Sequence, residues 1–443
     1  MKIRIIVMLS IMAFACNQSF GQSFLDRLKK KAKETVEEKI INKTGNGIDN
    51  GIDKGIEKAG GAIKGSKSSK DESNNESSGN STANMPKGNE KMQMNSSYAK
   101  YDFVPGEQVI YAADFKEERS GELPQDWNSN GNAIVSTLSG SEVNWLRIMQ
   151  RTLVLSSNTK TFGTDFTMEF DLLMQYKRNG WVVPNLNFGF LATGKYATTD
   201  NNLLKTLSAG THLFQVILHP ADEGRSNVKL ESFVGLSTYF ESGQKKFPDI
   251  ENMYGKKVHV AVQIQKERFR LWMDGIKVYD VPKALPVDAK LNQVFFQMED
   301  SSYDNEDIGV YVSELKIAKG IPNLRHKLID EGKFSTTGIL FDVNKASIKP
   351  ESAGVINEIA EVLKQNPNVK IMITGHTDSD GDEKANQSLS EKRAERVKAA
   401  LITVHGIPSD RLQSSGKGES VPVGSNSTKD GKAQNRRVEF TKL

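Results

Sequence analysis

An acidic and a basic side chain lie near the carboxyl end of this 443-residue sequence, and their types and spacing suit the binding of a charged group. Asp378 follows an alternating stretch, and Arg393 lies fifteen positions further on among residues with helical spacing. A guanidinium on the apolar side of a helix is rarely buried without an anionic partner. Arg393 is therefore expected to meet an anion, which is either Asp378, in an internal ion pair, or a ligand.

Two predicted elements position these side chains. Val369, Ile371 and Ile373 alternate with polar neighbours as in a half-buried strand, and Gly375 ends the run, so Asp378 sits just past a strand end. The next segment changes to a period of three to four residues, which predicts a helix with Arg393 on its apolar side. That side carries Leu389, Val397, Ala400, Leu401 and Val404, and the solvated side carries Lys392, Glu395 and Arg396.

Several ordered motifs around this pair resemble a known family. GHTDSDG contains Asp378, LSEKRA contains Arg393, and FDVNKASIKPES (341–352) and NRRVEF (435–440) lie before and after them. Within residues 334–443, these motifs and Asn386 are similar to the peptidoglycan-binding domain of the OmpA, Pal and MotB family. The resemblance implies an α+β domain in which Asp378 and Arg393 grip the free end of diaminopimelate in the peptidoglycan stem peptide.

The chemistry of that ligand agrees with the two residue types. The free end of diaminopimelate is a zwitterion, so a carboxylate can hold its ammonium while a guanidinium holds its carboxylate through two hydrogen bonds. Thr377, Asn386 and Arg437 match further family positions and could add hydrogen bonds, although each is more often part of the scaffold. We predict no catalytic residue, no metal site and no cofactor.

The amino end is typical of an exported protein. Lys2 and Arg4 precede an apolar run over residues 5–15 that is too short to span a bilayer, which predicts a signal peptide over residues 1–21 with cleavage before Gln22. Cys16, the only cysteine, follows an Ala-Phe-Ala stretch that loosely resembles a lipobox, so lipidation is the alternative to ordinary cleavage. The expected localisation is the outer membrane or periplasm of a Gram-negative cell envelope.

Two segments then separate the signal peptide from the folded part. Residues 22–64 begin with apolar residues at helical spacing, which predicts an amphipathic helix, and continue into a Gly-Ile repeat. Residues 65–97 contain almost no aromatic or branched apolar side chain, so a disordered linker is expected there. The net charge of +4 is small and gives no reason to expect a nucleic-acid partner.

Residues 98–320 are predicted to form an all-β domain, joined to the C-terminal domain by a connector at 321–333. Alternating runs at 168–174, 214–218, 258–264 and 269–273 read as antiparallel strands with one buried face, and Asp274-Gly275 predicts a tight turn. Their spacing suggests a two-sheet sandwich. The runs at 259–281 and 310–320 resemble a concanavalin-like jelly roll. A membrane-embedded β-barrel is the rival architecture, and charges within the runs favour the sandwich.

The resemblance of the sandwich implies that it could bind a glycan, and aromatic side chains are the candidate contacts. Trp127, Trp145 and Trp181 could stack on sugar rings, although aromatic residues in sandwiches are more often part of the core. A loop with several acids could hold calcium, but its spacing matches no known loop motif, so a solvated loop is expected. These acids are Asp300, Asp304, Glu306 and Asp307.

Glu169 and Asp171 are the nearest approach to a pair of catalytic carboxylates. The glucanase pattern requires a further acid where this chain has Leu173 and Met174, so we interpret the sandwich as non-catalytic. The predicted function is a non-enzymatic tether to peptidoglycan, associated with the outer membrane or an envelope protein assembly, with the sandwich binding a protein or glycan. The alternative is a carbohydrate-active enzyme that the C-terminal domain localises to the wall.

Overall fold

The computed structural model describes residues 98, 100–177 and 180–443. They belong to the second of the two units into which the chain divides, Asn89–Leu443. The signal peptide, the amphipathic helix, Cys16 and the linker lie outside the described residues. Within the part of the chain described, no helix has the length and apolar character needed to cross a membrane.

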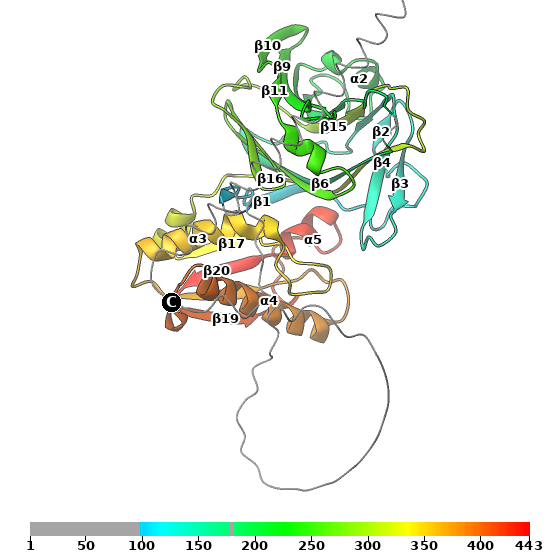
Figure 1. Cartoon of the computed structure of the whole chain (residues 1–443). Coiled ribbons are helices and arrows are strands. Elements are labelled where there is room, and N and C mark those ends of the chain that lie inside the picture. Colours follow the sequence, from blue (N-terminus) through cyan, green and yellow to red (C-terminus); the bar gives the residue numbers. More distant parts are fainter. Residues whose placement is uncertain (1–97, 99, 178–179) are drawn as a thin grey trace, which may run out of the picture. The chain divides into compact units, whose positions relative to one another are not determined.

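The middle of the chain folds into two eight-stranded antiparallel sheets (Figure 1). The first sheet has the order β14-β13-β12-β6-β16-β4-β3, with β1 also paired to β16, and the second has the order β10-β9-β8-β7-β15-β5-β2, with β11 paired to β9. The first sheet contains β1 (Gln108–Ala113), β3 (Ala133–Thr137), β4 (Asn144–Ile148), β6 (Asp165–Tyr176), β12 (Lys257–Gln265), β13 (Arg268–Met273), β14 (Ile276–Val281) and β16 (Ile308–Lys319). The second contains β2 (Asn128–Ser129), β5 (Thr152–Leu155), β7 (Leu186–Ala192), β8 (His212–His219), β9 (Asn227–Val234), β10 (Ser237–Glu241), β11 (Lys245–Lys246) and β15 (Gln293–Met298).

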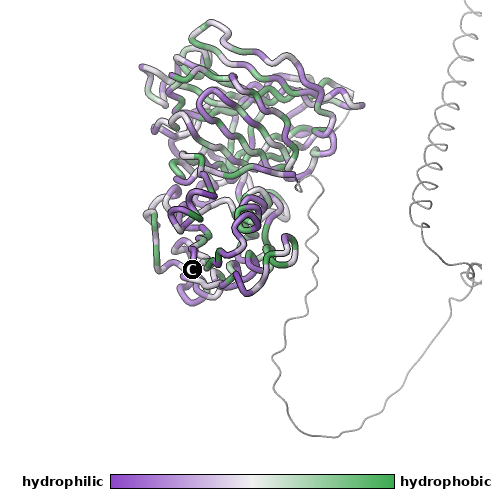
Figure 2. Tube along the Cα trace, turned by 90° about the vertical axis from the view of Figure 1, so that its left-hand side faces the viewer, coloured by the Kyte–Doolittle hydropathy of each residue, from purple (hydrophilic) through white to green (hydrophobic). Residues whose placement is uncertain are grey.

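The two sheets pack face to face through a shared aromatic core. The ring of Phe170 on β6 lies edge-on to Phe188 on β7 and to Phe296 on β15, with centroids 5.2 Å apart in both pairs. Buried hydrophobic residues recur along these strands, as the alternating runs predicted, and green hydrophobic stretches alternate with purple hydrophilic ones along the described chain in Figure 2. The predicted turn is also confirmed, because Asp274 and Gly275 both have positive φ, 47° and 80°, between the paired strands β13 and β14.

Strand β6 differs from the expected pattern of one buried face, because nine consecutive residues, 166–174, are buried. Met168, Phe170 and Leu172 face the sandwich core, whereas Glu169 and Asp171 face the C-terminal domain. The second face of the strand is thus covered by another domain. Alternation in a sequence identifies two faces of a strand, but it does not show what covers the polar one.

The C-terminal domain is an α+β fold around a four-stranded sheet with the order β17-β20-β18-β19. Strands β18 and β19 are parallel, and the other pairs are antiparallel. The strands are β17 (Lys333–Thr336), β18 (Ile371–Gly375), β19 (Leu412–Gly416) and β20 (Val438–Lys442), and the helices are α3 (Ala353–Gln365), α4 (Glu383–Thr403) and α5 (Lys429–Asn435). Short helical turns complete the described chain: α2 (Asn202–Lys205), η2 (Leu207–Ala209), η3 (Pro248–Asn252), η4 (His326–Asp330), η5 (Pro350–Ser352) and η6 (Ser409–Arg411).

The segment between the two domains is packed into the fold and is not a free linker. Leu324 and Leu328, within the expected connector, are buried in the core of the C-terminal domain. Where the chain enters the sandwich, Gln108 pairs with Lys319, the last residue of β16, and the amide of Glu107 donates to the carbonyl of Gly320. The entry and the exit of the sandwich are therefore hydrogen-bonded neighbours.

Helix α5 of the C-terminal domain closes the free edge of β1. The amide of Val109 donates to Oε1 of Gln434 at 2.5 Å, and the amide of Ala112 donates to Oδ1 of Asp430 at 2.8 Å. An exposed strand edge presents unpaired amides and carbonyls, and here side chains of α5 satisfy two of the amides. This contact joins the first sheet of the sandwich to the domain that carries the candidate site.

Candidate functional site

Strand β18 delivers the acidic side of the candidate site. Ile371 and Ile373 anchor the strand in the core, and the loop that follows buries His376, Thr377 and Asp378. Backbone hydrogen bonds fix this loop, because the amide of His376 donates to the carbonyl of Arg437 and that of Thr377 to the carbonyl of Gly418. Asp378 lies just past the strand end, as the sequence predicted.

Glycine at the end of β18 lets helix α4 pack closely over the strand. A Cβ at Gly375 would collide with the carbonyl oxygen of Ser390 on α4. Only a residue without a side chain permits this approach. The short distance between strand end and helix brings the loop that carries Asp378 to the same helix that carries Arg393.

The carboxylate of Asp378 is paired with Arg436, a residue that the sequence analysis did not single out. Nη1 of Arg436 lies 2.6 Å from Oδ2 of Asp378, while Oδ1 accepts from the amide of Asp380 at 3.3 Å. Burial acts against the charge of Arg436, but Asp378 more than offsets this and raises the pKa of Arg436. The internal ion pair considered between Asp378 and Arg393 does not form among the described residues.

Arg393 on α4 has no carboxylate partner among the described residues. Its Nε donates to the carbonyl of Lys345 at 3.0 Å and its Nη2 to that of Asp342 at 3.5 Å, and the guanidinium lies 4.9 Å from the ring centroid of Phe341. Burial lowers the pKa of Arg393 to about 10; the negative charge of Asp378 partly offsets this effect, and the positive charge of Arg436 adds to it. The neighbouring residues Lys392, Glu395 and Arg396 are exposed, as predicted. Arg393 is thus a partly desolvated cation that lacks an anion.

The three remaining predicted residues lie close to this pair but differ in their contacts. Asn386 donates to the carbonyls of Asp378 and Asp380 and to Glu419, so it fixes the loop. Arg437 donates to Glu439 at 2.7 Å and to the carbonyl of Val421, which is a scaffold role. The hydroxyl of Thr377 is buried and has no hydrogen-bond partner among the described residues.

The sequence offered a signal that Arg436 and Arg437 are alternative candidates, but none that chooses between them. Arg436 and Arg437 are neighbours at the entry to β20, and successive side chains in extended backbone point to opposite faces. Arg436 and Arg437 must therefore lie on opposite faces, so only one of them can contact the sheet. The motif NRRVEF therefore contains two candidates rather than one.

A cavity of about 150 Å³ lies beside these residues, and both domains contribute to its lining. Arg393, Arg436 and His376 come from the C-terminal domain, and Asp114 and Glu314 come from the sandwich. Burial, together with the positive charge of Arg437, lowers the pKa of His376 to about 4, so this imidazole is neutral at pH 7. Both of its nitrogens lack a hydrogen-bond partner in the described chain. The cavity therefore offers cationic, anionic and neutral polar groups to a ligand.

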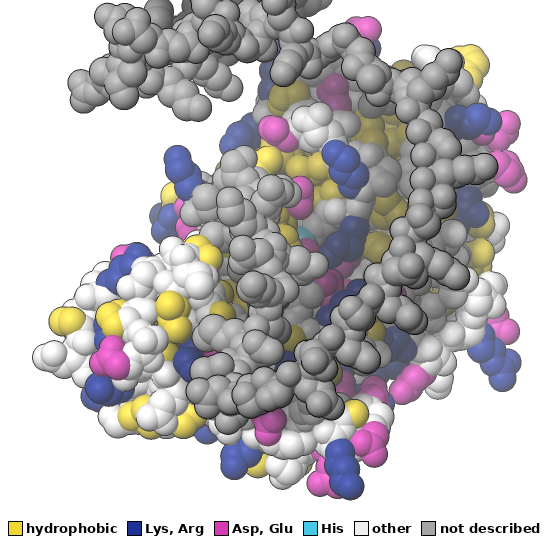
Figure 3. Space-filling view, turned by 60° about the horizontal axis from the view of Figure 1, so that its bottom comes forward, with side chains coloured by type: hydrophobic (Ala, Val, Ile, Leu, Met, Phe, Trp, Pro, Cys, Tyr) yellow, Lys and Arg dark blue, Asp and Glu magenta, His cyan; other side chains and the backbone are white. Residues whose placement is uncertain are grey.

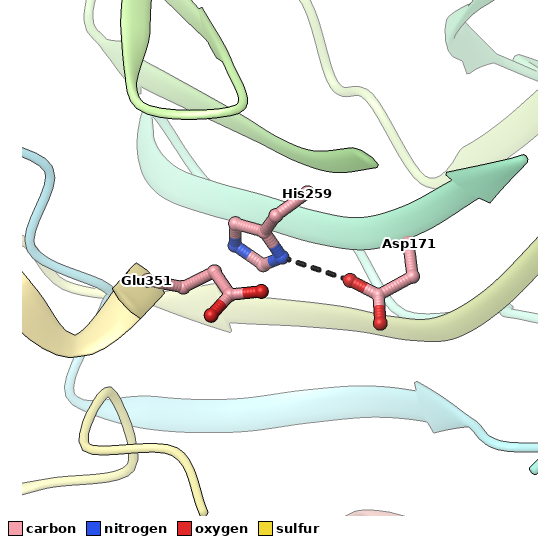
Figure 4. Close-up of side chains that lie close together, drawn as sticks. All are labelled: Asp171, His259 and Glu351. Carbon is pink, nitrogen blue, oxygen red and sulfur yellow. Dashed lines mark hydrogen bonds and ion pairs between the residues drawn. The ribbon is translucent and has the colours of Figure 1, made fainter. Parts of the chain in front are cut away.

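A second charged cluster, buried between the domains, contains the two acids considered for catalysis. Figure 4 shows His259 beside the carboxylates of Asp171 and Glu351, with Nδ1 3.1 Å from Oδ1 of Asp171. On its other side, Nε2 of His259 lies 3.5 Å from Oε1 of Glu169. Nζ of Lys257 lies 3.0 Å from both Asp171 and Glu351, which bridges the two domains. Nζ of Lys316 lies 2.8 Å from Glu169, so three acids meet three bases.

The protonation states of this cluster argue against acid-base catalysis. Burial would raise the pKa of Glu169, but Lys316 and His259 overcome it and bring the pKa down to about 2. Burial would also raise the pKa of Asp171, but His259 and Lys257 overcome it and hold this pKa far below its usual value. Burial would lower the pKa of His259, but Asp171 and Glu169 raise it to about 9. A general acid must hold a proton near neutral pH, and neither carboxylate does.

The same cluster is the group of potential metal ligands found among the described residues. One ligand atom from each of Asp171, His259 and Glu351 lies within 4.8 Å of the others. The ammonium of Lys257 already supplies a cation to both carboxylates, and a metal ion would have to displace it. The arrangement therefore fits an ion-pair network better than a metal centre.

The remaining candidate residues of the sandwich are the three tryptophans and the acids of one loop. Trp127 and Trp145 are buried, whereas Trp181 is 58% exposed. In the acidic loop, Asp300 pairs with Arg151 at 2.7 Å and Asp307 with Lys177 at 2.9 Å. Where grey atoms do not cover the surface in Figure 3, basic and acidic side chains lie side by side rather than in patches of one sign.

Comparison with known proteins identifies the C-terminal domain. The model of the OmpA family matches residues 340–436. The probable lipoprotein YiaD of Escherichia coli strain K12 is 44% identical over 103 residues, which is 23% of this chain and 47% of that protein. The outer-membrane lipoprotein YfiB of Pseudomonas aeruginosa is 40% identical over 114 residues, 25% of this chain and 67% of that protein. The chain belongs to the OmpA family. The resemblance inferred from the motifs is thereby confirmed.

The shared region of the OmpA family is the C-terminal domain alone. Outer membrane porin F of Pseudomonas fluorescens is 43% identical over 101 residues, 23% of this chain and 31% of that protein. The chain thus spans less than half of the length of YiaD and of the porin. These relatives are named as outer-membrane proteins and lipoproteins, in agreement with the localisation expected from the sequence. The concanavalin-like resemblance of the sandwich remains a prediction.

Proposed function

We propose that this protein is a non-enzymatic component of a Gram-negative cell envelope that anchors to peptidoglycan through its OmpA-family domain. The ligand is the free end of diaminopimelate in the stem peptide, bound by Asp378 and Arg393. Export, through the predicted signal peptide, places the chain in the periplasm or at the outer membrane. The named relatives, which are outer-membrane proteins and lipoproteins, support this localisation.

The observation that carries the proposal is the environment of Arg393. Its guanidinium is partly desolvated, lies over the ring of Phe341, and has no carboxylate partner in the described chain. Two backbone carbonyls orient it through Nε and Nη2, which leaves Nη1 without a hydrogen bond to the described residues. A planar guanidinium held in this way is prepared to bind a carboxylate.

Asp378 supplies the complementary charge for the ammonium of the ligand. Arg436 occupies Oδ2, but Oδ1 accepts only the long hydrogen bond from the amide of Asp380 among the described residues. A carboxylate has about four acceptor sites, so capacity remains for an ammonium donor. The buried hydroxyl of Thr377, which lacks a partner, is a further acceptor or donor beside it.

The sandwich is proposed to bind a protein or glycan of the envelope and thus to link it to the wall. No observation favours the alternative of a wall-bound carbohydrate-active enzyme. Glu169 and Asp171 are ionised, buried and paired with bases between the domains, so neither is available to a glycosidic bond. The exposed Trp181 is the aromatic side chain of the three considered that a sugar could reach.

Sedimentation with purified peptidoglycan tests the proposal. The full-length chain is expected to pellet with the wall material, and Arg393→Ala and Asp378→Ala are expected to abolish pelleting, because each removes one half of the charged contact. Arg396→Ala, an exposed arginine one turn away on α4, is the matched control and should pellet normally. Circular dichroism confirms that each variant is folded. Unchanged pelleting of both site variants overturns the assignment.

A further inference from the structure

Strand β16 contains an irregularity that aims one acid at the cavity. The strand pairs with β6 along its length, but its other neighbour changes from β4, at residues 310–312, to β1, at residues 315–319. The register with β6 shifts between Ser313 and Lys316, and Glu314 within this bulge has φ 52°. A residue with a Cβ rarely adopts this left-handed conformation, and bulges re-aim side chains.

The carboxylate of Glu314 has no ion pair and no hydrogen bond with the described residues. It lines the same cavity as Arg393 and Arg436, which belong to the OmpA-family domain. Burial, together with the negative charge of Asp171, raises the pKa of Glu314, and Arg436 partly offsets the rise. A strained backbone therefore holds an unpaired acid in a partly dry cavity, and strain of this kind concentrates at functional sites.

Most of the other charged residues that line the cavity have an ion-pair partner. Asp378 pairs with Arg436, and Asp114 pairs with Lys116 at 3.7 Å. The acids of the interdomain cluster pair with Lys257, Lys316 and His259, and Lys349 acts on that cluster by lowering the pKa of Asp171. Arg393 and Lys349 remain on the positive side and Glu314 on the negative side, each without an ion-pair partner in the described part of the chain.

We infer that Glu314 of the sandwich is a specificity-determining residue of the peptidoglycan site. Its carboxylate contacts, together with Asp378, the ammonium of the zwitterionic amino-acid end whose carboxylate is bound by Arg393. A cavity of about 150 Å³ accepts a molecule the size of benzene in another protein, so it can hold such a group. The inference rests on the proposed function and adds that a domain outside the OmpA family region completes the site.

Isothermal titration of the full-length chain with three stem tripeptides tests the inference. The first ends in meso-diaminopimelate, the second has its distal amine acetylated, and the third has lysine, which lacks the distal carboxylate. We expect Glu314→Gln to weaken binding of the first peptide about tenfold, as for the loss of one charged hydrogen bond. Acetylation should weaken binding to the wild type by a larger factor than binding to Glu314→Gln, because the variant has already lost one of the two carboxylate contacts with the ammonium and keeps only that of Asp378.

Two further variants separate binding from folding. Glu306→Gln, at an exposed acid outside the cavity, should bind like the wild type. Glu314→Gly should raise thermal stability, because glycine tolerates the positive φ, and should still weaken binding. The inference is overturned if Glu314→Gln binds the first peptide as tightly as the wild type while Arg393→Ala does not bind. If the wild type itself fails to bind, or does not distinguish the first peptide from the third, the proposed function fails and this inference with it.

Discussion

The carboxylate of Asp378 is bound by Arg436 from the end of helix α5, with 2.6 Å between Oδ2 and Nη1, and not by Arg393 from helix α4. This relationship leaves the guanidinium of Arg393 oriented by carbonyls and an aromatic ring but without an anion in the described residues. One arginine thus positions the acid of the site, and the other is available to a ligand.

Replacement of Arg393 by lysine tests the need for a planar group. Arg393→Lys keeps the positive charge but loses the fork and the stacking on Phe341, so the affinity for the diaminopimelate tripeptide should fall at least about tenfold. Isothermal titration measures this loss, and Arg396→Lys on the exposed side of α4 is the control. Equal affinity of Arg393→Lys and wild type would show that charge alone suffices.

Removal of Arg436 tests its role as the partner of Asp378. Arg436→Ala should lower the free energy of unfolding by about 2 kcal/mol, which is less than for a fully buried pair because the side chain of Arg436 is 34% exposed. Urea denaturation of Arg436→Ala, Asp378→Ala and the double variant gives the coupling energy. Strictly additive losses would mean that the pair contributes nothing beyond its separate contacts.

The interdomain cluster predicts a loss of stability in mildly basic solution. The folded-state pKa of His259 is about 9, above its ordinary 6.5, so its protonation stabilises the fold fully below pH 6.5 and this contribution disappears as the pH rises through 9. The melting temperature should therefore fall between pH 6.5 and 9, and His259→Asn should flatten the dependence. The charged groups that face His259 are Glu169, Asp171, Lys257, Lys316 and Glu351.

The acids of the same cluster predict the absence of glycosidase activity. Because Glu169 has a pKa of about 2, it is ionised at neutral pH and pairs with Lys316, so it cannot donate a proton to a glycosidic oxygen. The full-length chain should not hydrolyse β-glucans. Glu169→Ala should instead lower the thermal melting temperature, since it leaves Lys316 buried without its partner. If the wild type hydrolyses β-glucans and Glu169→Ala does not, the carbohydrate-active enzyme is the better description of this protein.

The sequence was informative wherever a local pattern decides the structure. Alternation placed the strands around Phe170, Asp274-Gly275 marked a turn, and the change of period after Gly375 separated β18 from α4. These features depend on neighbours in the chain. Family motifs added the identity of the C-terminal domain, which the comparisons confirm.

Features that depend on contacts between distant segments could not be predicted. Nothing local distinguishes Arg436 from Arg437, since the face that each presents depends on the docking of α5 and β20. The polar face of β6 resembled a solvated face, because only the packing of the two domains buries Glu169 and Asp171. The bulge at Glu314 arises where β16 exchanges one neighbouring strand for another, which no period in the sequence encodes.

The pairing of Gln108 with Lys319 has a mechanical consequence for a chain held at both ends. If the chain is anchored at both ends as proposed, a pull first reaches the contacts of Tyr98 with Asp274 and of Asp102 with Trp272. Beyond them the chain enters and leaves the sandwich at neighbouring points, at the base of β1 and β16. Most strands of the sandwich then lie outside the part of the chain that transmits the tension. The strands away from this point would then keep their native pairing while the chain is under tension.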